Sequence, residues 1–274
     1  DITVGDKVVG RDGFPTEVLA VYPQPDGLDI YEVTSYDGRK CRVGGEHLWQ
    51  SFYPNTTNKQ RWRVRDTIEL KRLLSLPNPR VYIPLPEPVH FNPIQDPLPV
   101  SPYFLGVAIG DGNINEKGFV NLTLNLRHRQ IYDHLMDTEK KVILANAKEN
   151  NVKNTLIVSF PDSWHLRKGF RDIGLAGKRA WEKFIPKRYM TASVHERREL
   201  MRDLMDTDGT VNKDSGQPSY CTTSKQLALD VQELAWSLGG IASISEKQPY
   251  FTYKGERKPG RTAYNVFLRF PKPS

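Results

Sequence analysis

Residues 104–112 read FLGVAIGDG, and residues 201–209 read MRDLMDTDG. Each stretch contains several apolar residues and ends in an Asp-Gly pair, and its aspartates, Asp111 and Asp208, lie 208 − 111 = 97 residues apart. One Asp-Gly pair on its own is typical of a turn or a helix end. Two copies with matching surroundings indicate a repeated unit. We therefore predict two helices that pack side by side and bring both carboxylates together, where they can hold a divalent cation.

The positive charge of the chain is concentrated after residue 97. The first 97 residues contain 12 Lys and Arg against 13 Asp and Glu, which gives −1, and the remaining residues contain 27 against 19, which gives +8. These values add up to the net charge of +7 for all 274 residues. A basic surface near paired acids favours a partner that carries phosphates, and we predict double-stranded DNA.

No stretch approaches the roughly eighteen apolar residues of a membrane span, and the N-terminus carries no secretory signal pattern. We therefore expect no membrane partner and a cytoplasmic location in a microbe or a phage-infected cell. Two cysteines, Cys41 and Cys221, are too few for a disulfide framework or a zinc site. Cys41 is predicted to be a buried thiol.

The sequence divides into three predicted parts: 1–97, 98–187 and 188–274. The first part has short strands between Asp-Gly turns, and the proline-rich stretch 76–102 excludes helix and marks a boundary. After each nonapeptide the same order of elements returns. Strands are expected at 4–9, 17–22, 31–35, 40–43, 118–126, 155–160, 241–247 and 263–270, and helices at 129–145, at 164–170 and from the cap Ser224 to 238, with a long basic connection after 247.

The two nonapeptides resemble the paired LAGLIDADG dodecapeptides of intein-encoded homing endonucleases. The resemblance implies an α+β fold with two pseudo-symmetric αββαββα halves, related by a pseudo-twofold axis, whose sheets form a saddle over DNA. It also implies a metal site for Mg²⁺ (or Mn²⁺) at Asp111 and Asp208, which includes the preceding residues Gly110 and Thr207. Asp206, the other acid of the second motif, is expected to bond backbone at the helix end.

A lysine near each acid is expected in this family to assist the attacking water. Residues 183–186 read KFIP and resemble the block that precedes the second dodecapeptide, so Lys183 is the candidate. The equivalent in the other half is expected on the last hairpin, with Lys247 and Lys254 as candidates.

Glycine spacing predicts a close approach of the two helices. Gly106 and Gly110 are four residues apart and therefore share one helix face, which lets a second helix approach. The second motif departs from this pattern, because Asp203 stands where the family commonly has glycine and Thr207 is bulkier than Gly110. The departure leaves two alternatives open, a looser seam or an additional polar contact.

Polar side chains that alternate along the expected strands are candidates for contacts with base edges and phosphates. Basic residues near the C-terminus add candidates for the DNA backbone. The complete set consists of Asn121, Thr123, Asn125, Arg127, Lys247, Thr252, Lys254, Arg257, Lys258, Arg261, Asn265 and Arg269.

The N-terminal part resembles half of an intein splicing domain, the Hint fold, over residues 4–10 and 31–49. Residues 44–49 read GGEHLW and resemble the block with the splicing histidine, which corresponds to His47. Splicing needs a nucleophile at the first residue and Asn after His at the end, whereas this sequence has Asp1 and a final PKPS. The chain is therefore expected to be either a trimmed intein or a free-standing nuclease that kept part of an ancestral intein, and His47 is expected to be a packed, hydrogen-bonded imidazole.

These patterns favour a site-specific double-strand DNA homing endonuclease that cuts one long asymmetric target. Because both motifs lie on one chain, it is expected to act as a monomer. A LAGLIDADG nucleic-acid-binding protein that does not cut, such as a maturase or a regulator, remains an alternative. The third alternative is a fragment of a self-splicing intein.

Overall fold

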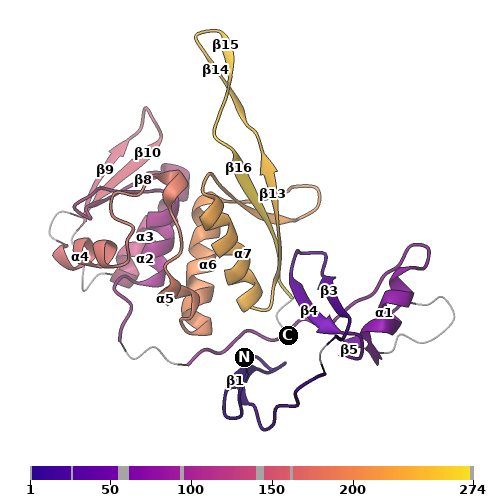
Figure 1. Cartoon of the computed structure of the whole chain (residues 1–274). Helices are drawn as coiled ribbons and strands as arrows, with labels where there is room; N and C mark the ends of the chain where they lie inside the picture. The colour runs from indigo at the N-terminus through magenta and orange to yellow at the C-terminus, as the bar shows by residue number, and fades with distance from the viewer. Residues whose placement is uncertain are drawn as a thin grey trace. The chain divides into compact units, whose positions relative to one another are not determined.

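The computed structural model describes residues 2–25, 27–54, 62–92, 96–139, 145–160 and 163–271. The chain forms two compact units, Asp1–Glu87 and Pro88–Ser274 (Figure 1). The second unit contains both nonapeptides, whereas the subdivision at residue 188 stays a prediction. In the described residues, no helix is both long and apolar enough to cross a membrane.

In its described residues, the first unit consists of three two-stranded antiparallel sheets and one helix. Few of its apolar side chains are buried, Leu70 and Leu73 of the helix among them. Cys41 is exposed, so its predicted burial was wrong, because its strand belongs to an isolated two-stranded sheet. The elements are β1 (Lys7–Val9), β2 (Pro15–Glu17), β3 (Ile30–Thr34), β4 (Lys40–Gly44), β5 (Leu48–Ser51), β6 (Arg63–Asp66) and α1 (Thr67–Leu74).

Most expected strands of this unit are present, but the one at 17–22 is wrong. Strand β2 covers Pro15–Glu17, pairs with β1 and leaves the following residues without regular structure. The continuous apolar run from Val18 to Tyr22 suggested a strand, but a strand also needs a partner.

The second unit is built around two packed helices, α2 (Pro102–Gly110) and α6 (Val194–Asp208) (Figure 1). Ser101 and Ser193 cap these helices by accepting hydrogen bonds from the backbone N–H of Phe104 and of Glu196. The remaining helices are α3 (Arg129–Glu139), α4 (Trp164–Asp172), α5 (Lys187–Met190) and α7 (Lys225–Ser237), with short 3₁₀ turns η1 (Leu126–His128) and η2 (Ala180–Glu182).

Two four-stranded antiparallel sheets accompany the helices. The first has the order β7-β8-β10-β9 and the second β11-β12-β16-β13, so the four strands of each are arranged in the same way. Their bounds are β7 (Gly112–Ile114), β8 (Val120–Asn125), β9 (Asn146–Asn150), β10 (Thr155–Ser159), β11 (Gly209–Val211), β12 (Pro218–Thr222), β13 (Ile241–Lys247) and β16 (Ala263–Arg269). The mixed helix and strand content of the prediction is confirmed.

One expected helix extends beyond the described residues, and one expected connection contains additional structure. Helix α3 is described to Glu139, and the predicted continuation through 140–144 lies outside the described residues. The basic connection after Lys247 is not a loop throughout. It contains a further hairpin, β14 (Tyr250–Tyr253) and β15 (Glu256–Pro259), which stands out from the rest of the unit in Figure 1.

Candidate active site

Helices α2 and α6 approach most closely where α2 has glycine. A Cβ built on Gly106 would lie 2.6 Å from Cβ of Asp203, and one built on Gly110 would lie 2.5 Å from Cβ of Thr207. Real Cβ atoms do not come so close, so only glycine fits both positions. The contact between the two helices is therefore tight, and the alternative of a looser contact, which the size of Thr207 had suggested, does not apply.

Thr207 also contributes a polar contact, but within its own helix. Its Oγ1 donates to backbone oxygens of α6, at 3.0 Å from Asp203 O and 3.1 Å from Leu204 O. Because the Thr207 hydroxyl is engaged in this way and Gly110 has no side chain, each residue could bind a metal only through its main-chain carbonyl oxygen. Their place in the metal site remains a prediction.

The two motif acids lie at corresponding ends of the packed helices. Asp111 is the C-terminal cap of α2, Asp208 is the last residue of α6, and each is followed by the first strand of a sheet. Burial and then the charge of Asp111 raise the pKa of Asp208 to about 6, and burial also raises the pKa of Asp111. Gly110 and Thr207, the residues directly before the two acids, are in contact, so the two helix ends meet.

Lys183 connects this site to the end of α2. Its buried Nζ donates to the backbone oxygens of Ala108 at 3.1 Å, Ile109 at 2.6 Å and Gly112 at 2.8 Å. Burial lowers the pKa of Lys183 to about 8, against the opposing effects of Asp208 and Asp111. An ammonium group has three N–H donors, so all of them are engaged with main chain.

These residues suit a hard divalent cation. Mg²⁺ prefers oxygen ligands and is commonly held by one or two carboxylates together with phosphate and water oxygens. In the described ranges, no group of three or more His, Cys, Asp and Glu side chains is placed to hold a metal ion. The pair Asp111 and Asp208 offers carboxylate oxygens, which is the donor set of a site completed by substrate and water.

An open groove of 1080 Å³ leads to Asp111 from the side of the first sheet. It is lined by Asp111, Lys183 and the strand residue Thr123, together with a basic and aromatic segment that precedes Lys183. That segment includes Lys178, Arg179 and Trp181. The groove can accommodate an extended anionic chain beside Asp111.

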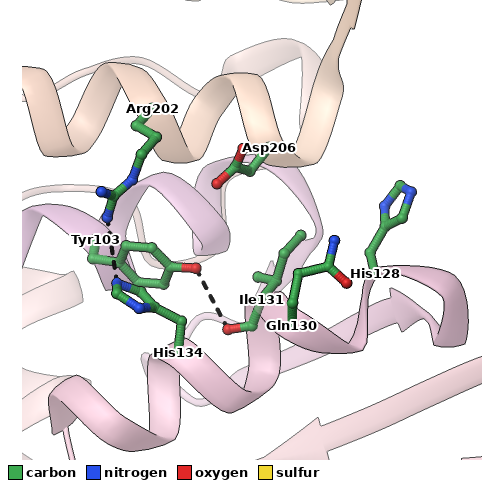
Figure 2. A pocket seen from close by; sticks show the side chains of 7 residues that line it. All are labelled: Tyr103, His128, Gln130, Ile131, His134, Arg202 and Asp206. Carbon is green, nitrogen blue, oxygen red and sulfur yellow. Dashed lines mark hydrogen bonds between the residues drawn. The ribbon is translucent and has the colours of Figure 1, made fainter.

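A second, smaller pocket of 370 Å³ lies between α2, α3 and α6 (Figure 2). Arg202 contacts the ring of His134 at 3.3 Å, and the hydroxyl of Tyr103 donates to Ile131 O at 3.5 Å. The carboxylate of Asp206 points into this pocket, not toward the backbone as expected (Figure 2). Its direction follows from its position on α6, two residues before Asp208, since successive helix positions face different sides.

The first sheet presents its predicted contact residues on an exposed face. Asn121, Thr123 and Asn125 alternate with buried residues along β8, and Arg127 is exposed in the turn that follows. Asn125 also has a local structural role. Its side chain accepts from Arg127 N at 2.9 Å and from Asn154 Nδ2 at 3.1 Å. DNA binding by this face remains a prediction.

The second sheet has a corresponding face. Cys221, Asn265 and Ser245 lie opposite one another on three adjacent strands, and Lys247 lies on the same face of β13. Arg269 is exposed at the far end of β16. The other predicted contacts are on or beside the β14–β15 hairpin, namely Thr252, Lys254, Arg257, Lys258 and Arg261.

Neither candidate for the second lysine resembles Lys183. Lys254 lies in the turn at the tip of the hairpin. Lys247 is exposed, and its charge lowers the pKa of Cys221, whereas burial and the charge of Asp208 raise that pKa. Sequence reasoning did not foresee that Cys221 lies near Asp208, or that His128 lowers the pKa of Asp111. The position of Cys221 on β12, the second strand after Asp208, could have indicated that it lies near this acid. No local pattern in the sequence indicates that His128 lies near Asp111.

His47 of the first unit is exposed, so the expected packed imidazole is wrong. Its ring contacts Trp49 edge-on, with centroids 4.9 Å apart, and its backbone oxygen accepts from Thr67 Oγ1 at 3.3 Å. The small core of the unit leaves this ring at the surface.

Comparisons with known proteins place the second motif in a recognised family model. Residues 195–265 match the LAGLIDADG-like domain, a range that begins in α6 and ends in β16. Among solved structures, a mesophilic variant of the homing endonuclease I-DmoI is similar, with a TM-score of 0.39 and 14% identity over 62% of this chain and 83% of that chain. The N-terminal LAGLIDADG domain of DUF199/WhiA has a TM-score of 0.34 and 9% identity, over 62% and 78%.

Curated relatives have two different names. The replicative DNA helicase DnaB of Mycobacterium intracellulare is 27% identical over 97% of this chain, which spans 43% of that protein's length. A DNA gyrase subunit of Mycobacterium gordonae is 25% identical over 61% of this chain and 31% of its own length. The chain therefore resembles a part of each relative, and in residues 195–265 it resembles the LAGLIDADG-like domain.

Proposed function

We propose that this protein is a metal-dependent, site-specific double-strand DNA endonuclease of the LAGLIDADG type. The observation that carries the proposal is the contact of Gly110 with Thr207, which brings together the two helix ends where Asp111 and Asp208 follow. Two carboxylates that repel each other gain from a shared cation. The match of residues 195–265 to the LAGLIDADG-like domain supports the same interpretation.

Asp111 and Asp208 would hold Mg²⁺ or Mn²⁺ through their carboxylate oxygens, with the carbonyls of Gly110 and Thr207 as additional donors. When bound, the metal supplies positive charge against the scissile phosphate and lowers the pKa of the attacking water. The glycine contacts of the seam keep the acids in position, since any side chain at Gly106 or Gly110 would move the helices apart.

Lys183 would serve the reaction as a positioning residue. Its three N–H groups are engaged with the carbonyls at the end of α2, so it fixes the backbone on both sides of Asp111. Its charge also acts on both acids. These bonds favour a positioning role over the direct contact with water that the family resemblance implies.

Duplex DNA is the substrate that suits two sheets of the same strand order. Each sheet has an exposed face with polar side chains, Asn121 and Thr123 on the first and Asn265 on the second. A pseudo-twofold arrangement of two halves on one chain would match the two strands of a duplex, while the different side chains would read an asymmetric sequence. We infer that one chain is sufficient for activity.

The relatives favour an intein-type element. The same chain matches a DnaB helicase and a DNA gyrase, in each case over less than half of the relative's length. An inserted element shared by two otherwise different proteins accounts for this distribution. The exposed apolar residues of the first unit, such as Val8, Ile30 and Leu48, suit a partial splicing domain.

The test is to incubate the protein with a library of duplex DNA and Mg²⁺ and to sequence the cut ends. We expect double-strand cuts at one long asymmetric sequence, and we expect the Asp208→Asn variant to bind that sequence without cutting both strands. Asp206→Asn is the matched control, because Asp206 is on the same helix turn but points into the other pocket. This control should cut like the unchanged protein.

Two results would overturn the proposal. A library that stays intact with Mg²⁺ and with Mn²⁺, while one sequence is retained by binding, would favour the regulator or maturase alternative. Cutting that survives both Asp111→Asn and Asp208→Asn would show that the chemistry lies elsewhere.

A further inference from the structure

The β14–β15 hairpin is a ribbon that projects beyond the second sheet. Its strands continue from β13 and β16, and the described chain has no counterpart in the first sheet, where β9 and β10 are joined without an additional strand pair (Figure 1). A two-residue turn closes the ribbon at Lys254 and Gly255, both with positive φ, of 50° and 79°. This geometry suits the right-handed twist of two antiparallel strands.

Neither face of the ribbon is covered by protein. Every residue of both strands is exposed, including Tyr250, Phe251 and Tyr253, each more than half exposed. The register places Tyr250, Thr252 and Arg257 on one face and puts Phe251, Tyr253 and Lys258 on the other. An isolated two-stranded hairpin is only marginally stable in water, so large exposed aromatics on both faces indicate a binding surface.

A basic side chain lies over the ring of each tyrosine in the hairpin. The guanidinium of Arg257 lies 4.5 Å from the ring centroid of Tyr250, and Tyr253 has Lys258 at 5.5 Å and Lys254 at 5.6 Å. Between residues 250 and 261 there are four basic side chains and one acid, Glu256. Basic side chains held over exposed aromatic rings suit the phosphate backbone of duplex DNA.

The base of the hairpin is attached to the rim of the catalytic groove. The guanidinium of Arg261 lies 3.6 Å from the ring centroid of Trp181, and Arg179 lies 5.7 Å from the same ring. Both Trp181 and Arg179 line the groove that contains Asp111 and Lys183. The hairpin therefore begins where a DNA backbone would leave that groove.

We propose that the β14–β15 hairpin is a DNA-binding arm that holds duplex DNA outside the target covered by the two sheets, and only on the side of the second sheet. The inference rests on the proposed endonuclease function and adds an asymmetric footprint to it. From Lys247 to the tip the chain has seven further residues, which at about 3.3 Å per residue reach roughly 20 Å. That length corresponds to about six base pairs at 3.4 Å each.

The experiment compares three duplexes that contain the identified target. One ends at the edges of the region protected by the sheets, and the others are extended by ten base pairs on one side or the other. We expect the unchanged protein to bind roughly ten times more tightly when the extension is on the side of the second sheet. The triple variant Tyr250→Ser, Phe251→Ser, Tyr253→Ser should bind both extended duplexes equally, although it keeps all cations.

The matched control is Trp164→Ser, which removes an exposed aromatic from α4 and should keep the preference. A double variant, Arg257→Gln with Lys258→Gln, should lower the slope of log affinity against log salt concentration by about 2. Cleavage of the short duplex by the unchanged protein tests the proposed function separately. Equal affinity of the unchanged protein for both extended duplexes would overturn the proposal of a DNA-binding arm. An unaltered preference in the triple variant would do the same, as would binding of the hairpin to anionic vesicles in place of DNA.

Discussion

Helices α2 and α6 end in the same chemistry but are built from different residues. Helix α2 is buried from Tyr103 to Ile109 and contains no charged residue, whereas α6 buries Arg197 and Asp203 and exposes charged side chains on its outer side. The two helices share a serine N-cap, the close contact between them and the terminal acid. The proposed site needs a close contact of the helices and two carboxylates, while the rest of each helix is adapted to its own surroundings.

The ends of the two helices are also secured in different ways. Lys183 donates to three carbonyls around the end of α2, whereas the end of α6 is held by the hydroxyl of Thr207, which bonds to the carbonyls of its own helix. A single buried lysine therefore acts on both acids from the first half. Four predictions test this asymmetry, starting with the largest expected effect.

The first prediction compares Lys183→Met with Lys247→Met. Loss of Lys183 leaves buried carbonyls without donors, which should reduce the free energy of unfolding by about 3 kcal/mol and cleavage at least a hundredfold. Lys247 is exposed, so its replacement should affect stability by less than about 0.5 kcal/mol. Urea unfolding and single-turnover cleavage measure both effects, and similar losses for the two variants would contradict the asymmetry.

The second prediction concerns the seam. Gly110→Ala places a methyl group against the side chain of Thr207 and should destabilise the protein by about 2 kcal/mol. Combining it with Thr207→Gly removes the obstacle, so the double variant should recover part of the loss, as seen in thermal unfolding. Additive losses in the double variant would mean that the two residues are not in contact.

The third prediction uses the buried acid of α6. Neither carboxylate oxygen of Asp203 has a hydrogen-bond partner among the described residues, and burial raises its pKa from 3.8 to about 9. Between about pH 4 and pH 9 the folded chain therefore holds a proton that the unfolded chain has released, so stability falls as pH rises through this window. The fall is at most about 1.4 kcal/mol per pH unit.

Asp203→Ala should remove this contribution and flatten the stability profile between pH 7 and pH 8, above the raised pKa of Asp208. Asp206→Ala is the control, because Asp206 is exposed on the same helix. Unfolding free energies at several pH values measure the slope. A slope that persists in Asp203→Ala would show that another group binds the proton.

The fourth prediction has the smallest expected effect and compares two asparagines, one on each sheet. Asn265→Ala should change base preference at one position of the target by about tenfold without loss of stability. Asn125→Ala should instead loosen the turn before α3, because its side chain bonds Arg127 N and Asn154 Nδ2. Cleavage of a target library by each variant measures both, and a single-position change for Asn125 would contradict its structural role.

Sequence patterns predicted the elements that depend on local chemistry. The structure confirms the strands at 241–247 and 263–270 and the helix capped by Ser224. Their signals, apolar alternation, helical spacing and a capping serine, depend on residues that are close together in the sequence. The expected glycine seam is confirmed as well. Lys183 could be selected from its KFIP block, but its bonds to α2 join residues more than seventy positions apart.

Other features could not be predicted because they depend on tertiary surroundings. The β14–β15 hairpin is exposed on both faces and therefore lacks the apolar alternation that reveals a half-buried strand. The exposure of Cys41 and His47 follows from the small core of their unit. Asp203 was seen as a departure from glycine, but its complete burial depends on how closely α2 approaches.

The central claim is that Asp111 and Asp208 hold one divalent cation between the two helices. Anomalous diffraction at the manganese absorption edge, from crystals of the protein with its target DNA and Mn²⁺, tests it most directly. We predict an anomalous peak within coordination distance of both carboxylates. A peak held by other residues, or the two carboxylates bound to no common ion in a crystal that still cuts its DNA, would contradict the account.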